Sequence, residues 1–216
     1  MSLRVALLLL LTHEPMTGYD LHQSFQRSTG NLWRATDAQI YPELRRMERE
    51  GLIAGEDEAW GAKAVKRWYH VTADGHEYIA QWMREPMHDT DASHRDPMRL
   101  RAGYFEWTDP ETARRRLREH IRHHEQEVAL YQSLTAAIER YRDPAWVASD
   151  ADNSVLGKRL RKAPSAQHER IIEFKLFAYD GMISAAKAEI AWARRGLRLL
   201  RELDASAKSP ASGGDD

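Results

Sequence analysis

Residues 36–53 read TDAQIYPELRRMEREGLI, and this stretch predicts one amphipathic helix. Thr36 and Gln39 have the spacing of a helix N-cap and its reciprocal partner. Gly51 is a typical residue just beyond a helix end, because glycine adopts a left-handed backbone without a steric penalty. We therefore expect a helix that starts near Thr36 and stops at Gly51.

Three apolar side chains define the inner face of this helix. Leu44 and Met47 fall within about 40° of Ile40 when successive residues are placed 100° apart, and the acidic residues fall on the flanks. The strip opposite the apolar face comprises Ala38, Pro42, Arg45, Arg46 and Arg49. This pattern favours a DNA-recognition helix, because arginine binds phosphate or makes a bidentate contact with guanine.

The predicted elements around this helix follow the order of a winged helix-turn-helix domain. Residues 2–12 and 17–30 read as two helices that precede it. Two short β-prone runs within residues 52–71 surround a glycine-containing turn and read as a hairpin, and residues 72–86 read as a fourth helix. Three helices, a two-stranded wing and a connecting helix are the parts of this motif.

The expected fold is mainly α and has two functional parts. Residues 1–86 form the winged helix-turn-helix domain, and the polar residues 87–96 form a linker. Residues 97–204 form a C-terminal, coiled-coil-like α-helical domain for dimerisation and effector binding. Residues 205–216 are small, polar and glycine-rich, so we expect a disordered tail.

Two long helices dominate the C-terminal half. Asp109 followed by Pro110 predicts the start of the first, and the second covers residues 167–203. Both repeat apolar residues at alternating spacings of four and three, which is typical of coiled-coil packing. Residues 144–165 between them read as irregular and basic. The second helix's seam, which we expect to form a dimer interface, includes Ile172, Leu176, Tyr179, Ile183, Ile190 and Leu197.

The hairpin and the start of the 36–51 helix extend the predicted DNA-binding surface. Lys63, Lys66 and Arg67 lie at or beside the hairpin turn, where a wing meets the minor groove or the flanking backbone. Pro42 lies inside the helix, where it removes one backbone hydrogen bond, and a purely structural helix has little reason to carry it. The alternative to a DNA-binding surface is a solvated helix face whose charges form intrahelical salt bridges. The predicted DNA-contacting residues are Thr36, Ala38, Gln39, Tyr41, Pro42, Arg45, Arg46, Arg49, Lys63, Lys66 and Arg67.

The composition limits the classes of function. The formal net charge is −1, and residues 1–90 contain ten Lys and Arg against thirteen Asp and Glu, so DNA binding must come from a local patch. The absence of cysteine excludes disulfides and thiolate metal sites and suits the cytoplasm. The sequence contains no membrane-length apolar run, phosphate loop, nucleophile elbow or zinc-protease motif. We predict no enzymatic activity, no cofactor and no membrane association.

Two other clusters of side chains are candidates for small-ligand sites. His120 and His124 are four residues apart, but no third ligand has convincing spacing, so we predict no metal site. Aromatic residues that flank the domain junction could line a pocket for a small aromatic effector, although such residues at helical spacing are more often core. The candidates for ligand binding are Trp82, Phe105 and Trp107.

Several motifs together resemble the PadR family of transcriptional regulators. TGYDL at residues 17–21 and IYPEL at residues 40–44 are followed by EREGLI at residues 48–53 and RWYHVTADG at residues 67–75. The resemblance covers about the first 85 residues and is weaker beyond them. The C-terminal half looks like the long-chain type, although residues 144–165 are longer and more basic than that pattern, and two arginines interrupt a helix that is usually more apolar.

The resemblance implies a homodimer that binds a palindromic operator as a repressor and is released by a small planar ligand. The long C-terminal helices would form the dimer interface. One alternative is an adaptor that uses the winged fold for protein contacts, and it predicts loss of the arginine strip. A second alternative is RNA binding, which favours exposed aromatic residues and single-stranded targets.

Overall fold

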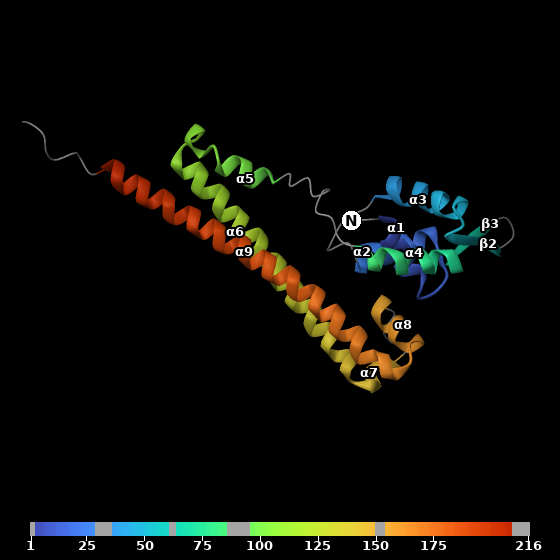
Figure 1. Ribbon diagram of the computed structural model, residues 1–216. Coiled ribbons are helices and arrows are strands. Elements are labelled where there is room, and N and C mark those ends of the chain that lie inside the picture. The colour runs from blue at the N-terminus through green and yellow to red at the C-terminus, as the bar shows by residue number, and fades with distance from the viewer. Residues whose placement is uncertain (1–2, 29–35, 61–63, 86–95, 150–153, 209–216) are drawn as a thin grey trace, which may run out of the picture. The chain divides into compact units, whose positions relative to one another are not determined.

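The computed structural model describes residues 3–28, 36–60, 64–85, 96–149 and 154–208 (Figure 1). The chain divides into two compact units. Unit 1 combines residues 1–89 with 147–165, and unit 2 combines residues 90–146 with 166–216. The division after residue 89 falls inside the range 87–96 expected to be a linker, and residues 147–165, expected in the C-terminal domain, group with the N-terminal part.

Unit 1 contains a winged helix-turn-helix domain, as the sequence predicts. Its elements are α1 (Leu3–Leu11), β1 (Met16–Thr17), α2 (Gly18–Ser28), α3 (Asp37–Arg49), β2 (Ile53–Trp60), β3 (Ala64–Val71) and α4 (Ala73–Arg84). The antiparallel sheet has the order β1-β3-β2, so the wing has a third strand beyond the predicted two. This strand is only two residues long, with Met16 opposite Tyr69, and local sequence patterns do not reveal so short a segment.

The core of unit 1 is built from the apolar faces of its first three helices. Leu7 and Leu8 of α1, Phe25 of α2, and Ile40 and Leu44 of α3 are completely buried. Each such side chain contributes about 1.5–3 kcal/mol relative to an exposed one. This packing holds the inner face of α3 against the domain and turns its opposite face outward.

The end of α3 is a Schellman motif. The Gly51 N–H donates to the carbonyl of Glu48 at 3.0 Å, and the Leu52 N–H donates to that of Met47 at 2.9 Å. Gly51 has a φ of 76°, which places it in the left-handed region. The predicted stop at Gly51 is therefore confirmed, and the chain turns there directly into β2.

The described parts of residues 144–165 are mostly helical, so the prediction of an irregular segment is wrong there. They contain α7 (Pro144–Ala148) and α8 (Val155–Lys162). Ser154 caps α8 by accepting the Gly157 N–H at 3.0 Å. Leu160 is completely buried, and Val155 packs against the core of the winged domain.

Two lysines of the basic segment anchor α8 to the loop after α1. Lys158 Nζ lies 2.8 Å from Glu14 Oε1, and Lys162 Nζ donates to the His13 carbonyl at 2.6 Å. These contacts join residues more than 140 positions apart in the sequence. The basic cluster therefore helps to seat a helix from the C-terminal half of the chain on the winged domain.

Unit 2 is dominated by α6 (Pro110–Glu139) and α9 (His168–Lys208), which run antiparallel and side by side (Figure 1). Its shorter elements are α5 (Pro97–Ala102), the 3-10 turn η2 (Phe105–Trp107) and the 3-10 turn η3 (Arg140–Arg142). Asp109 caps α6 by accepting the Thr112 N–H at 2.8 Å, as its position before Pro110 predicts. No described helix combines the length and apolar character that a membrane span requires.

The predicted seam of α9 packs mainly inside one chain. Ile172, Tyr179 and Ile190 are 1%, 9% and 8% exposed, and the Tyr179 ring lies 6.1 Å from that of Tyr131 on α6. Assigning these three residues to a dimer interface is therefore corrected, because α6 of the same chain already covers them. Leu176, Ile183 and Leu197 of the same predicted set are partly exposed.

The C-terminal boundary also differs from the prediction. The helix continues through Lys208, so residues 205–208 are helical rather than part of a tail. The rest of the predicted tail, residues 209–216, lies outside the described residues.

Candidate DNA-binding surface

The outer face of α3 is open to solvent along its length. Ile40, Leu44 and Met47 are buried, as their spacing predicts. The residues on and beside the outer strip, all exposed, are Thr36, Ala38, Gln39, Tyr41, Pro42, Arg45, Arg46 and Arg49. The helix therefore has the geometry of a recognition helix, while the contact of each residue with DNA stays a prediction.

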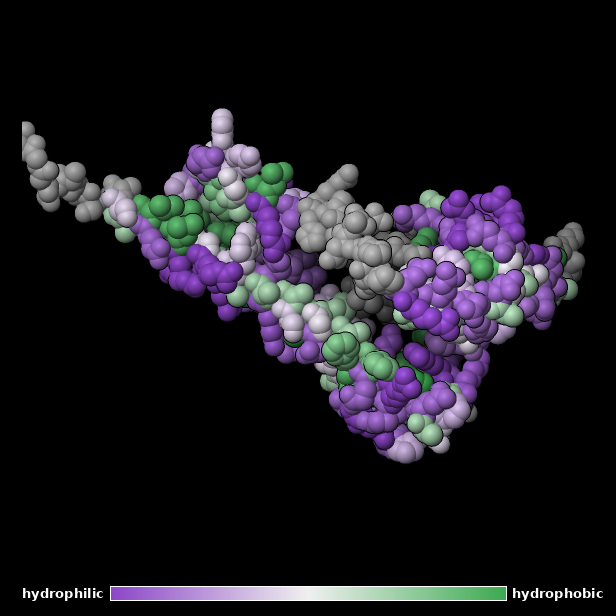
Figure 2. Space-filling model, viewed as in Figure 1, coloured by the Kyte–Doolittle hydropathy of each residue, from purple (hydrophilic) through white to green (hydrophobic). Residues whose placement is uncertain are grey.

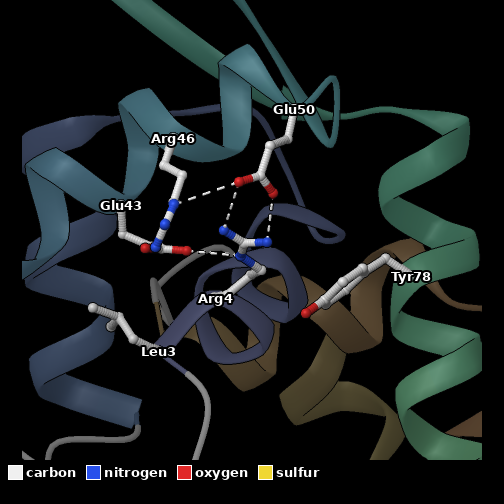
Figure 3. A pocket seen from close by; sticks show the side chains of 6 residues that line it. All are labelled: Leu3, Arg4, Glu43, Arg46, Glu50 and Tyr78. Carbon is white, nitrogen blue, oxygen red and sulfur yellow. Dashed lines mark hydrogen bonds and ion pairs between the residues drawn. The ribbon is translucent and has the colours of Figure 1, made fainter.

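Arg4 of α1 pairs with the glutamates on one flank of α3 (Figure 3). Its Nε lies 2.7 Å from Glu43 Oε1, and its Nη1 lies 2.5 Å from Glu50 Oε2. Burial lowers the pKa of Arg4, but hydrogen bonds to the two carboxylates outweigh that effect and raise the pKa above its ordinary value. Glu50 also lies 3.5 Å from Arg46 Nε.

Arg67 of β3 pairs with the carboxylate on the other flank. Its Nη2 donates to Glu48 Oε1 and its Nη1 donates to Asp57 Oδ1, both at 2.6 Å. Hydrogen bonds with Glu48 and Asp57 raise the pKa of Arg67 above its ordinary value. Two carboxylates of its own domain hold this guanidinium and tie β3 to α3, while its predicted contact with DNA stays a prediction.

These pairs leave two arginines of α3 without an ion pair to the described residues. Arg45 and Arg49 form no salt bridge within the described ranges, and Arg49 Nε donates only weakly to the Arg45 carbonyl at 3.4 Å. Each glutamate at or beside α3 is neutralised by a cation from another element. The outer strip therefore presents positive charge even though the helix itself is nearly balanced.

The described strands of the wing add little positive charge to this surface. Lys66 is half-buried, stands opposite Glu58 in the strand register and has contacts of its own. Glu56, Asp57 and Glu58 make the neighbouring strand acidic and exposed. Lys63, the third predicted wing contact, lies outside the described residues.

The N-terminal end of α3 is braced by two local contacts. The Thr36 N–H donates to Gln39 Oε1 at 3.0 Å, so the predicted capping partner is in place. A Cβ added at Gly18 would lie 2.7 Å from Tyr41 Cε1, so the Tyr41 ring packs directly on the start of α2. This contact fixes α3 relative to α2.

The predicted effector residues are not gathered into a described pocket. Trp82 lies on α4 of unit 1, whereas Phe105 and Trp107 belong to η2 of unit 2, where Trp107 is 85% exposed. An open cleft of about 440 Å³ occurs instead in unit 1 (Figure 3). Its lining is Leu3, Arg4, Glu43, Arg46, Glu50 and Tyr78. The ion pairs that cross it make it unsuited to an apolar ring.

The domain and its outward arginine helix define the winged helix-turn-helix class of DNA-binding transcriptional regulators. Residues 7–81 match the transcriptional regulator PadR-like family, and residues 94–201 match the C-terminal region of virulence activator alpha. The winged domain belongs to the PadR-like family, and the C-terminal half carries the match expected of the long-chain type. The resemblance noted from the sequence motifs is thereby confirmed.

Individual relatives agree with this assignment. The chain is similar to the negative transcriptional regulator PadR of Bacillus subtilis, with 33% identity over 90 residues that cover 41% of this chain and 50% of the relative. The chain spans about half the length of the curated relatives it matches.

Solved structures show the same fold. B. subtilis PadR in complex with operator DNA superposes with a TM-score of 0.61 at 21% identity, covering 88% of this chain and 98% of that one. The complex of the same protein with p-coumaric acid gives 0.56 at 20% identity, covering 89% and 95%. The Vibrio cholerae virulence activator AphA gives 0.53 at 24% identity, covering 90% and 99%.

Proposed function

We propose that this protein is a sequence-specific transcriptional repressor that binds a palindromic DNA operator as a homodimer. The observation that carries the proposal is the charge arrangement of α3. Arg4 and Arg67 neutralise the glutamates on its flanks, and Arg45 and Arg49 remain on the outer strip without an ion pair within the described ranges. Such a helix suits the major groove, where arginine contacts phosphates and guanine edges. The role involves no catalysis and belongs in the cytoplasm.

The relatives support this choice of function. The B. subtilis relative is named a negative regulator, and a structure of similar fold contains operator DNA. The adaptor alternative predicts that the arginine strip is lost, whereas the strip is present and exposed. Residues 94–201 match the C-terminal region of virulence activator alpha, and the fold resembles that of the virulence activator AphA, so expression measurements must test repression against activation.

Dimerisation is proposed through the outer face of α9. Phe174 and Phe177 are 62% and 75% exposed and lie on the side of the helix opposite Ile172 and Tyr179. Figure 2 shows hydrophobic residues at several places along the surface of the α6–α9 pair. A buried aromatic side chain removes about 150–250 Å² from water, so covering this face with a second copy is strongly favourable.

A small planar aromatic ligand is proposed to release the DNA. The support is the structure of B. subtilis PadR with p-coumaric acid, together with the aromatic side chains that the sequence singles out. Trp82, Phe105 and Trp107 remain the proposed contacts. Quenching of tryptophan fluorescence by a panel of phenolic acids tests this part, and a Trp107→Leu variant shows whether Trp107 reports on the site.

The test of the DNA proposal begins with selecting bound fragments from a random duplex library and measuring affinity by fluorescence anisotropy at fixed salt. The Arg45→Ala/Arg49→Ala variant should bind the selected duplex at least about tenfold more weakly. Arg116→Ala, which removes an exposed arginine of unit 2 paired with Glu119, is the matched control. Unchanged affinity in the folded double variant would reject the assignment of α3. Tighter binding to the corresponding single strand would favour RNA-type recognition instead.

A further inference from the structure

Unit 2 brings three metal-binding side chains together from its two long helices. His120 and His124 lie one turn apart on α6, and Glu189 faces them from α9. One ligand atom from each lies within 4.8 Å of the other two. His120 Nε2 is 3.2 Å from Glu189 Oε2, and the centroids of the two imidazole rings are 4.4 Å apart. The third ligand, which the spacing on α6 could not supply, therefore comes from α9, 69 residues away in the sequence.

Each of the three side chains is partly buried and held in place. The side chains of His120, His124 and Glu189 are only 15%, 16% and 22% exposed. Partial burial limits the rotamers that each can adopt and still leaves the cluster reachable by an ion. The entropic cost of organising the ligands is therefore largely met before an ion arrives.

The carboxylate of Glu189 is oriented by Arg99 of α5. Arg99 Nη2 donates to Oε1 at 2.5 Å, which leaves Oε2 directed at His120. Arg99 thus occupies one oxygen of the Glu189 carboxylate and leaves the other available as a ligand.

His124 is oriented by a second carboxylate. Its Nδ1 lies 2.6 Å from Glu127 Oε2, so its Nε2 is the nitrogen left for an ion. A carboxylate on the far nitrogen of a histidine is the usual support for a metal ligand, because it fixes the tautomer and raises the basicity of the ring.

We propose that His120, His124 and Glu189 bind one divalent transition-metal ion of the zinc class. Two imidazoles and one carboxylate are the donors that Zn²⁺ takes in three-ligand sites, with water in the fourth position. Tetrahedral coordination requires ligand atoms about 3.3 Å apart, so atoms now up to 4.8 Å apart close by small side-chain rotations. The ion links α6 to α9 and, through Arg99, holds α5 to the same point.

A neighbouring group offers a competing arrangement on α6 alone. His123, His124 and Glu127 also have ligand atoms within reach of one another. His123 is 65% exposed, and all three residues lie on two successive turns of α6. Such a group has no partner from α9 and does not link the helices, so His123 distinguishes the two arrangements.

The test uses the full-length protein without a histidine tag, after treatment with EDTA and dialysis. Zn²⁺ is titrated by calorimetry, Co²⁺ is titrated by visible absorption, and thermal unfolding is followed with and without Zn²⁺. We expect one ion per chain, the absorption bands of tetrahedral Co²⁺, and a rise in melting temperature with Zn²⁺. This readout does not involve DNA, so it stands or fails independently of the proposed function.

Four variants assign the ligands. Glu189→Gln, His120→Asn and His124→Asn should each weaken Zn²⁺ binding at least about tenfold. His123→Asn is the matched control on the same helix and should change it less than about twofold. Circular dichroism checks the fold of each variant, and His120→Asn carries the test if Glu189→Gln does not fold. Absence of stoichiometric binding, unchanged affinity in Glu189→Gln, or loss of binding in His123→Asn each overturns the proposal.

Discussion

Arg67 Nη2 donates to Glu48 Oε1 at 2.6 Å and so connects the wing to the helix that faces outward for DNA. The same guanidinium also donates to Asp57 on the adjacent strand. Sequence position alone suggested that Arg67 grips the DNA backbone. The structure shows a residue that positions α3 and neutralises one of its glutamates.

Arg67→Ala should therefore weaken DNA binding without removing a DNA contact. Glu48 loses its partner, and its free negative charge then lies beside Arg45 and opposes the phosphates. We expect a loss of roughly threefold to tenfold in affinity by anisotropy at low salt. Arg67→Ala/Glu48→Gln removes the freed charge and should recover most of the loss. If the double variant binds as poorly as the single one, Arg67 acts on DNA directly.

The salt dependence of DNA binding should show how many phosphate contacts the arginines make. Each phosphate contact contributes about 0.9 to the slope of log affinity against log salt. If Arg45 and Arg49 both contact phosphates in each subunit of a dimer, Arg45→Ala/Arg49→Ala should lower the slope by up to roughly 3.6. Affinities measured over a range of potassium chloride concentrations give the slope. A weaker complex with an unchanged slope would show that these residues contact bases instead of phosphates.

The stability of the winged domain should depend on α8. Leu160 is completely buried in unit 1, so Leu160→Ala should lower the free energy of unfolding by about 2–5 kcal/mol. Urea denaturation followed by circular dichroism measures the change. Leu130→Ala, at a leucine that is 45% exposed on α6, is the control and should have little effect. An equally small effect at Leu160 would mean that α8 does not belong to the winged domain.

The oligomeric state should depend on the outer face of α9. Phe174→Glu/Phe177→Glu should give monomers in sedimentation velocity, because two charges would replace the apolar surface proposed to bury against a second copy. Ile172→Glu tests the buried face of α9 and should instead disrupt the packing of α9 on α6, since Ile172 is 1% exposed within the chain. A dimer that survives the double substitution would place the interface elsewhere on unit 2.

Local periodicity was enough to predict most elements of the fold. Ile40 and Leu44 repeat at the helical spacing, Gly51 ends the helix, and Asp109 with Pro110 begins the long one. Such signals act between residues a few positions apart, so the sequence carries them directly. The outward strip with Arg45 and Arg49 could be predicted for the same reason, since the buried face of a helix determines the exposed one.

Contacts between distant residues could not be predicted in this way. The heptad-like spacing of Ile172 and Tyr179 indicates an apolar seam, but α6 and a second copy of the chain would satisfy it equally well. The roles of Arg67 and Glu189 depended on partners from other elements.

The sequence by itself thus determined the winged helix-turn-helix order, the two long helices and the face on which Arg45 and Arg49 lie. Only the tertiary structure decided which charges are neutralised, where α8 packs, and that Glu189 meets His120. The physical reason is the separation along the chain over which each interaction acts. Backbone periodicity and capping are local properties of the chain, whereas ion pairs and buried contacts depend on which elements the packed core brings within a few ångströms of each other.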